Sequence, residues 1–337
     1  MKKTYFSLTG LFIVISIILI SCEFEEKSGK PHSIGKSSEI LVVTNNKAQW
    51  NSAIGDSIMG FFYAEVEGMP QPEPMFTLVN IPQEIFNATY EKNRNIFIVD
   101  IDPDFKKAQT ETRKNLWAKP QRVIKITAPD KQSFIREFEE NKDTFLELFI
   151  RIERERVVKA FKTAEANETI KALKENFGIY LTVPSVYRIA KKTNNFMWLR
   201  KETLAFSQGI MIYQYDYTDT LAFNPDHIIS KRNKMTRTYV PGPSDTTFMS
   251  VSTDIVPPVF KEVNFNDMYA IETRGLWEVE GDFMGGPFLS FTFVNESNNK
   301  VITLDAYVYA PNEPKRDLLR QLEAILYTLR FVSPDEE

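Results

Sequence analysis

The sequence predicts an α+β protein built from two mixed sheet-and-helix domains. A chain of 337 residues is longer than one hydrophobic core comfortably supports, so two domains are expected. The 43% hydrophobic content and the 26 Phe residues are ample for two cores. Apolar runs with strand and helix periodicity alternate along the chain, without a clear internal repeat. The second domain is expected to be a largely antiparallel sheet covered by a C-terminal helix.

The N-terminal domain is expected over residues 39–178, as an α/β or α+β unit. Residues 50–62 have helical spacing, and residues 131–162 form a longer helix with a stripe of Phe side chains on one face. A further helix over 164–176 ends at Gly178, a residue suited to a C-cap. Four apolar runs predict strands, namely 39–43, 75–81, 95–100 and 122–127.

The C-terminal domain is expected over residues 179–333 and is richer in strands. A helix is predicted over 225–234, and a closing helix begins near Pro314, a residue suited to a first turn. The closing helix buries Leu318, Leu322, Ile325, Leu326 and Leu329. Strands are predicted over 180–183, 187–190, 196–200, 209–217, 269–283, 288–294 and 301–309.

The first residues read MKKTYFSLTGLFIVISIILISC and predict a lipoprotein signal peptide over 1–21. A basic start precedes an apolar run that is shorter than the roughly 20 residues a membrane span needs. The run ends in Leu19-Ile20-Ser21-Cys22, which closely resembles the bacterial lipobox. The resemblance implies that Cys22 carries lipid chains and becomes the new N-terminus, which would anchor the protein in a membrane. The alternative is an ordinary secretory signal with an unrelated Cys.

Residues 22–38 are polar and aperiodic, and we expect a flexible tether there. Its acidic start, Glu23, Glu25 and Glu26, is similar to surface-export signals of bacteroidete lipoproteins. A merely solvated linker is an equal alternative. The membrane, through Cys22, is therefore the first partner that the sequence predicts.

The composition excludes several classes of function. One Cys and two His permit no intrachain disulfide, and they are too few for a Cys/His zinc site once Cys22 is lipidated. A formal charge of −4 disfavours nucleic-acid binding, which requires a basic face. We expect no metal, no cofactor and no nucleic acid.

The densest candidate stretch is RGLWEVEGDFMGGPF, residues 274–288. As a strand it directs Trp277 and Phe283 inward, and Gly285-Gly286-Pro287 supplies the turn. A phosphate loop is disfavoured because Pro, not Lys, follows Gly286. Two nearby carboxylates would suit a glycoside hydrolase, whereas a solvated strand face and a structural turn are the simpler interpretation. The candidate binding surface comprises Arg274, Trp277, Glu278, Glu280 and Asp282.

Two weaker candidates favour structural roles. Asp100, Asp102, Asp104 and Glu111 have the acidic spacing of an EF-hand loop, but its sixth place is not Gly. A strand end followed by a Pro turn and a helix capped by Asp104 is the preferred interpretation. The chain contains no G-x-S-x-G nucleophile elbow, so His227 is not expected to act in a catalytic triad, and a structural or surface role is favoured.

Eight stretches together resemble an uncharacterised lipoprotein family of bacteroidete envelopes, classed only as a domain of unknown function. The resemblance spans the mature chain and implies no activity or catalytic residue; only the lipid site at Cys22 carries over. The stretches are SIGKSSEILVV (33–43), QPEPMF (71–76), RNIFIVDI (94–101), WAKPQRVI (117–124), TNNFMWLRKET (193–203), PGPSD (241–245), RGLWEVEGDFMGGPF (274–288) and YVYAPNEPKRDLLRQLEAIL (307–326).

The sequence therefore favours a lipid-anchored protein of the bacterial cell envelope, in the outer membrane with a periplasmic or surface face. Its expected role is a non-enzymatic binding or scaffold module for an envelope protein or polymer. One alternative is a carboxylate-based hydrolase that acts on glycans near Glu278, Glu280 and Asp282. Another is a carrier of a small ligand or lipid, which requires an enclosed apolar cavity between sheet and helix.

Overall fold

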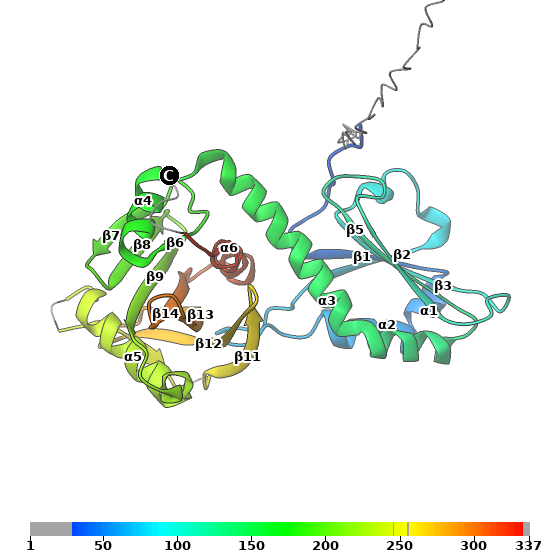
Figure 1. The fold of residues 1–337 in the computed structure, drawn as a ribbon. Coiled ribbons are helices and arrows are strands. Elements are labelled where there is room, and N and C mark those ends of the chain that lie inside the picture. Colours follow the sequence, from blue (N-terminus) through cyan, green and yellow to red (C-terminus); the bar gives the residue numbers. More distant parts are fainter. Residues whose placement is uncertain (1–28, 245, 255, 333–337) are drawn as a thin grey trace, which may run out of the picture. The chain divides into compact units, whose positions relative to one another are not determined.

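Two large β-sheets, of five and eight strands, organise the described part of the chain, and helices pack against both of them (Figure 1); the short strands β6 (Ile179–Tyr180) and β15 (Arg330–Phe331) form a separate two-stranded sheet. The computed structural model describes residues 29–332 apart from residues 245 and 255. The expected signal peptide and Cys22 lie outside the described residues. The architecture confirms the α+β class, with two sheet-and-helix domains.

The N-terminal sheet has five strands in the order β2-β1-β3-β5-β4. The first four are parallel, and β4 is an antiparallel edge strand. Helix α3 follows the sheet as one 31-residue element, Lys131–Phe161. The other elements are β1 Glu39–Thr44, α1 Lys47–Trp50, α2 Ala53–Phe62, β2 Thr77–Pro82, η1 Gln83–Ile85, η2 Tyr90–Lys92, β3 Asn95–Ile101, β4 Gln109–Lys114 and β5 Arg122–Ala128.

Phenylalanine rings build the core between this sheet and its helices. Phe62 of α2 contacts the rings of Phe76, Phe97, Phe138 and Phe149 at centroid distances of 5.7–6.5 Å, all close to edge-on. Such pairs add about 0.5–1.5 kcal/mol each beyond area burial. The Phe stripe predicted for residues 131–162 is therefore confirmed as the buried face of α3.

Residues 31–38 pair with the N-terminal domain, although the sequence suggested a flexible tether there. Lys119 donates its backbone N–H to Pro31 O at 2.9 Å, and Ile34 exchanges backbone hydrogen bonds with Lys92 and Arg94. Ser38 is buried. The tether prediction is thus wrong for residues 31–38, because a polar segment can satisfy its backbone groups along a loop without any hydrophobic signal.

The C-terminal sheet has eight strands, and every pair of neighbours is antiparallel. The strand order is β10-β12-β13-β14-β9-β8-β7, with β11 added against β12. The elements are η3 Lys162–Ala164, α4 Asn167–Phe177, β6 Ile179–Tyr180, β7 Arg188–Lys192, β8 Phe196–Glu202, β9 Ser207–Asp216, η4 Thr220–Phe223, α5 Pro225–Tyr239, β10 Phe248–Ser252, β11 Val259–Phe265, β12 Met268–Glu280, β13 Gly285–Asn295, β14 Lys300–Tyr309, α6 Arg316–Leu326 and β15 Arg330–Phe331.

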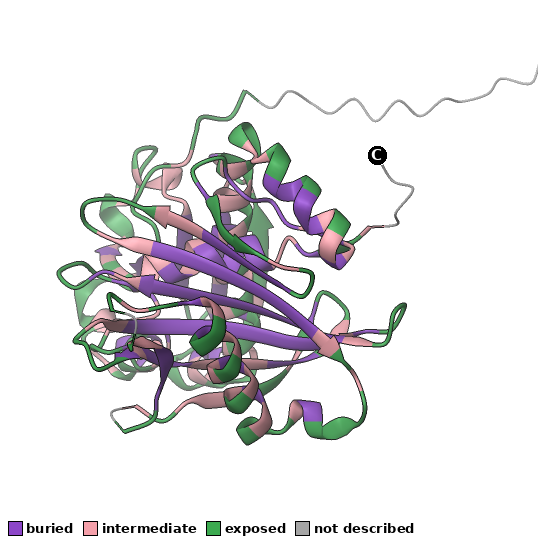
Figure 2. Cartoon of the chain, turned by 90° about the vertical axis from the view of Figure 1, so that its left-hand side faces the viewer, coloured by how far each residue is buried: buried purple, intermediate pink, exposed green. Residues whose placement is uncertain are grey.

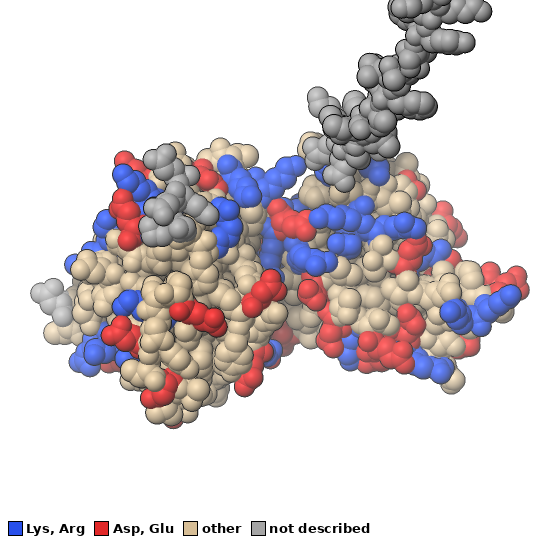
Figure 3. Space-filling model, in the orientation of Figure 1, with Lys and Arg blue, Asp and Glu red and all other residues tan. Residues whose placement is uncertain are grey.

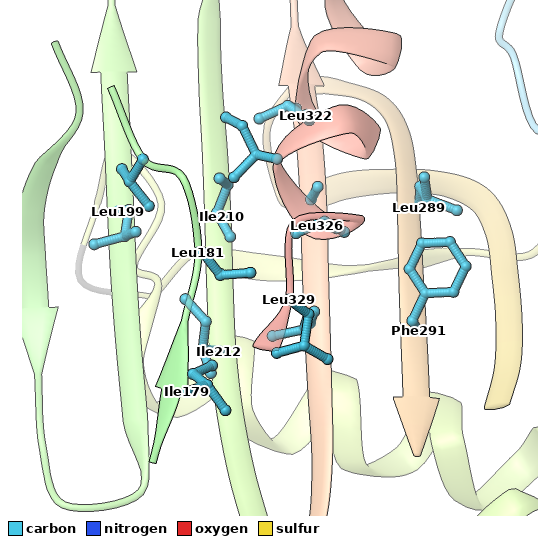
Figure 4. Packing of buried hydrophobic residues seen from close by; sticks show 14 of the residues in the cluster. Ile179, Leu181, Leu199, Ile210, Ile212, Leu289, Phe291, Leu322, Leu326 and Leu329 are labelled. Carbon is cyan, nitrogen blue, oxygen red and sulfur yellow. The ribbon is translucent and has the colours of Figure 1, made fainter. Parts of the chain in front are cut away.

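Helix α6 covers one face of this sheet, as the sequence predicted. Figure 4 shows Leu322 and Leu326 of α6 above Ile210 of β9 and Leu289 and Phe291 of β13. Helix α4 adds side chains to the same core and ends at Gly178 in the left-handed conformation, with a φ of 64°. The strands between the layers are buried along most of their length (Figure 2).

The opposite face of the sheet is covered by α5. Its half-buried Ile229, Met235 and Tyr239 pack into a second cluster with Tyr213 of β9 and Trp277 of β12. The ring of Tyr239 stacks on that of Phe196 at 4.5 Å. The sheet is therefore a layer between helices on both sides, which explains why strands β13 and β14 are buried at nearly every position.

Three local predictions are wrong. The turn between β12 and β13 lies at 281–284, not at 285–287. Gly281 is the residue of this turn that adopts a positive φ, of 83°. Phe283 is at the tip of this turn and is fully exposed, not inward. The helix that Asp104 was predicted to cap is also absent from this position. Instead, the backbone N–H of Asp104 donates to Asp102 Oδ1 at 2.9 Å, in a turn that leads to β4.

A buried carboxylate joins α6 to both domains. Glu323 accepts from Arg154 of α3 at 2.7 Å and lies 3.5 Å from Arg274 of β12. Burial alone would raise the pKa of Glu323, but the charges of Arg154, Arg274 and Arg320 outweigh it and lower the pKa to about 2. Arg274 is also held by Glu272 at 2.6 Å.

Replacing this carboxylate should destabilise the protein in a pH-dependent way. Glu323→Gln leaves buried guanidinium groups without their partner, which costs about 3 kcal/mol at pH 7. The pKa of Glu323 is about 2 in the folded state and about 4.3 in an unfolded chain. Its stabilisation is therefore complete above the unfolded pKa and is lost as the pH falls toward the folded pKa.

Urea denaturation at neutral and acidic pH checks this prediction. The difference between the wild type and Glu323→Gln should shrink as the pH is lowered from about 7 to about 3.5. Glu139→Gln is the control, because Glu139 pairs with Lys142 in solvent and should change stability by less than about 0.5 kcal/mol. An unchanged wild-type-to-Gln difference across this range would contradict the argument.

Candidate functional site

A hollow of about 700 Å³ opens on the α5 side of the C-terminal sheet. Helix α5 ends at Tyr239, and the chain continues through Pro241 and Pro243, which cannot extend the helix. The end of the sheet beyond α5 is thus left without a helix. We call this site the C-terminal hollow; its lining residues are Trp198, Arg200, Glu202–Ser207, Val240–Pro243, Met249, Trp277, Val279, Met284, Tyr307, Tyr309 and Pro311.

Three aromatic side chains form the floor of the hollow, and their polar atoms are already paired. Trp198 Nε1 donates to the Tyr307 hydroxyl at 3.0 Å, and Trp277 Nε1 donates to Val308 O at 3.1 Å. The rings of Trp277 and Tyr307 meet edge-on at 5.3 Å. Burial raises the pKa of Tyr307 to about 12, so its hydroxyl stays neutral. Both indole N–H groups are therefore occupied, and the Tyr307 hydroxyl, which accepts from Trp198, keeps only its own proton to donate to a ligand.

Glycines opposite these rings make room for them. Gly286 pairs with Trp277 and Gly209 pairs with Tyr307 across neighbouring strands. A Cβ at Gly209 would lie 2.2 Å from the Tyr307 ring, and one at Gly286 would lie 2.1 Å from Val308 O. The rings can lie across the adjacent strand only because these positions have no side chain. This close approach, rather than the turn that the sequence suggested, is what Gly286 provides.

The walls of the hollow are mostly apolar and come from loops. Phe206, Met284 and Tyr309 are half-buried, whereas the floor rings are almost fully buried. At the rim, Arg200 forms an ion pair with Glu202, and its guanidinium lies 4.8 Å from the centre of the Trp198 ring. The rim charges therefore compensate each other, and the hollow has no single charge sign.

A buried ion pair lies beside the floor, between the sheet and α5. Arg232 of α5 donates to Asp305 of β14 at 2.7 and 3.3 Å, and the guanidinium also lies 4.0 Å from the centre of the Phe288 ring. Burial raises the pKa of Asp305, although Arg232 opposes this shift. Both side chains are at most 1% exposed. They fix α5 on the sheet and do not line the hollow.

The structure brings only one of the predicted surface residues into the hollow. Trp277 lines it, whereas Arg274 and Glu278 lie on the opposite face of the sheet by strand alternation. Arg274 belongs to the Glu323 network. Glu280 and Asp282 are exposed near the hairpin turn. These five residues therefore do not form one surface.

The acidic residues that suggested an EF-hand do not form a metal site. Asp100 pairs with Lys125 at 2.8 Å, and Glu111 pairs with Arg113 on β4. Across residues 29–332, leaving aside 245 and 255, no cluster of three or more His, Cys, Asp or Glu side chains is arranged to hold a metal ion. None of the helices within that range is long and apolar enough to cross a membrane.

Adding a side chain at Gly286 should disturb the floor. In Gly286→Ala the new methyl group collides with Val308 O, so the strands must shift, at a cost of about 1–3 kcal/mol. Urea denaturation measures the loss, and the fluorescence of the indoles reports the altered Trp277 hydrogen bond.

Gly60→Ala is the matched control for this substitution. A Cβ at Gly60 meets nothing within 4 Å on helix α2, so Ala there should stabilise the protein by about 0.5–1 kcal/mol. Equal stability of the two variants would refute the role assigned to Gly286.

Comparison with solved structures finds only distant likeness. A protein from Bacteroides thetaiotaomicron VPI-5482, with a crystal structure at 1.50 Å resolution, aligns at 9% identity over 48% of this chain and 47% of its own length, with a TM-score of 0.26. The human StarD13 (DLC2) lipid transfer and protein localization domain aligns at 9% identity over 44% of this chain and 89% of its own, with a TM-score of 0.21. The match thus spans less than half of the first structure, and likeness at this level identifies neither fold nor function.

Family models match both domains. Residues 33–162 match a domain of unknown function, DUF8532, and residues 165–328 match another, DUF4837. No curated protein matches the chain. The two models meet at the end of α3, and α4 packs into the core of the C-terminal sheet. Two domains of unknown function thus cover most of the chain.

Proposed function

We propose that the protein is a lipid-anchored component of the bacterial cell envelope and that its C-terminal hollow binds an apolar ligand without catalysis. The hollow carries the proposal, because it is a concave site with aromatic, Met and Pro walls and a volume typical of ligand pockets. The lipobox-like residues 19–22 support the anchor and the envelope location. An outer-membrane position, facing the periplasm or the surface, belongs to the same proposal.

The paired polar atoms favour an apolar ligand over a glycan. A sugar exchanges many hydrogen bonds with water for hydrogen bonds with its site, and unmade ones are costly. Here the indole N–H groups of Trp198 and Trp277 already have acceptors, and Arg200 and Glu202 already pair with each other. An alkyl chain or an aromatic ring has no such requirement and gains from burial. We therefore assign the hollow to a fatty acyl chain or a similar apolar group.

The same geometry does not favour the glycan hydrolase. Glu278 lies on the other face of the sheet, and Glu280, at the end of β12, and Asp282, in the turn, are exposed. The one carboxylate in the lining is Glu202, which is neutralised by Arg200. A glycosidase requires two carboxylates facing each other across a cleft.

Filling the hollow should abolish binding of a fluorescent polyene fatty acid. Ala205 is exposed on the β8–β9 turn and lines the hollow, so Ala205→Trp occupies the site without burdening the core. We expect saturable binding to the wild type, competition by palmitic acid, and at least about tenfold weaker binding to the variant, as for loss of a well-packed apolar contact.

Ala160→Trp is the control, because Ala160 is exposed on α3, far along the chain from the hollow. It should bind the fatty acid as the wild type does. Oligosaccharides are the second probe: displacement of the polyene by a glycan, or equal binding by Ala205→Trp, would reject the assignment.

The anchor has its own test. Cys22 is the only Cys in the chain, so metabolic labelling with palmitate reports on a single thiol. Cys22→Ala should lose the label and move from the membrane fraction to the soluble envelope fraction, because several acyl chains at about 0.8 kcal/mol per CH₂ provide the attachment. A label that survives in Cys22→Ala would eliminate the anchor.

A further inference from the structure

We propose that two hairpin tips at the mouth of the C-terminal hollow, Leu204 and Phe283, insert into a lipid bilayer. The proposal rests on the proposed function, because the anchor at Cys22 would hold the folded domains beside a membrane. It adds a second, reversible contact with that membrane, made by the C-terminal domain itself.

Both side chains are exposed to an unusual degree. Leu204, in the β8–β9 turn, has a relative exposure of 110%, and Phe283, in the β12–β13 turn, has 107%. The other exposed large hydrophobic residues within the described part of the chain reach 63% at most. Neither tip residue therefore packs against the described protein, and both project into the surroundings.

The two turns lie at the same end of the sheet. Ser207, just after the first turn, pairs with Tyr309 at the end of β14. Gly286, just after the second turn, lies against Val308, the residue before Tyr309. Leu204 and Met284 both line the hollow, so its mouth opens between the tips. An acyl chain could then pass from the bilayer into the hollow without crossing water.

A bilayer fits these tips better than a protein partner does. Leu204 and Phe283 each follow a polar residue, Thr203 and Asp282, and project beyond the surface, whereas their apolar neighbours Phe206 and Met284 are half-buried in the wall of the hollow. Two single projecting side chains differ from the broad apolar patch that protein interfaces use. The chain itself supplies the second argument, since its lipobox-like segment predicts a membrane next to the protein.

The charges around the tips favour a neutral lipid surface. Glu202 is compensated by Arg200, and Asp282 adds an acidic group beside Phe283. On the face seen in Figure 3, basic side chains gather over the upper middle of the molecule, with some acidic ones among them. The contact should therefore occur on phosphatidylcholine and should persist at high salt, because apolar insertion is not screened.

Site-specific labels test the insertion. The full lipidated chain is reconstituted into phosphatidylcholine vesicles with a polarity-sensitive NBD label on Leu204→Cys or Phe283→Cys; acylation blocks Cys22 from labelling. Both labels should shift to shorter emission wavelengths on reconstitution and lose intensity when doxyl-labelled lipids are included. Asn298→Cys is the matched control, because it lies on the β13–β14 turn of the same sheet, beyond its opposite end.

The outcomes separate this proposal from the proposed function. Labels at 204 and 283 that behave like the label at 298 overturn the insertion, even if the unmodified protein binds the polyene fatty acid. A wavelength shift without doxyl quenching also overturns it, since that result means contact with protein. Doxyl quenching at both tips supports the insertion, and it does so even if the hollow fails to bind the fatty acid.

Discussion

The arrangement of the chain depends on a carboxylate that is buried among cations. Glu323 cannot be buried as an isolated charge, and its guanidinium partners come from α3, β12 and α6 itself. Helix α3 supplies Arg154 while its Phe stripe is locked in the N-terminal core. The position of α6 is therefore set by two domains at once, and any shift of α6 would leave charges unpaired in a low-dielectric environment.

The N-terminus of α6 is held by a second carboxylate. Glu73, in the proline-rich connector of the N-terminal domain, accepts the backbone N–H groups of Lys315 and Arg316 at 2.8 Å each. A carboxylate is favourable at a helix N-terminus because the first N–H groups have no partner within the helix. With both ends held, α6 packs on one face of the C-terminal sheet together with α4. The C-terminal hollow lies on the other face, where the sheet extends beyond the end of α5.

The parts of the fold that the sequence predicts are those with local periodicity. The Phe stripe of α3 and the apolar runs of β1 and β3 carry their own signal, because burial of one face imposes a repeat. Strand β4 was missed because QTETRK has no apolar residue and is placed only by its pairing with β5. Edge strands can be polar since both faces are wet.

The hollow could not be predicted, because its residues are brought together from distant strands. Trp198, Trp277 and Tyr307 lie on β8, β12 and β14, and no local pattern separates them from ordinary core aromatics. Gly286 reads as a turn residue because glycine suits both a turn and a close approach of a ring, and only the register decides between them. Arg232 lies in a segment with several basic residues, and nothing local marks it as buried. Asp305, a lone acid within an apolar strand, is the sequence signal that a buried cation is required.

The proposed insertion of the two tips is weak enough to require the proposed lipid anchor. Full burial of a Leu or Phe side chain is worth about 1.5–3 kcal/mol, so two tips give about 3–6 kcal/mol at best. A dissociation constant of about 1 mM already corresponds to about 4 kcal/mol, so the tips alone would leave the membrane readily. A lipid anchor raises the local concentration of bilayer to the range in which such weak contacts are populated. Folding gains nothing from Leu204 or Phe283, since neither is buried in the described structure. In the proposed contact, a bilayer would supply the burial that the protein does not, and the mouth of the hollow would lie at the source of the proposed apolar ligand.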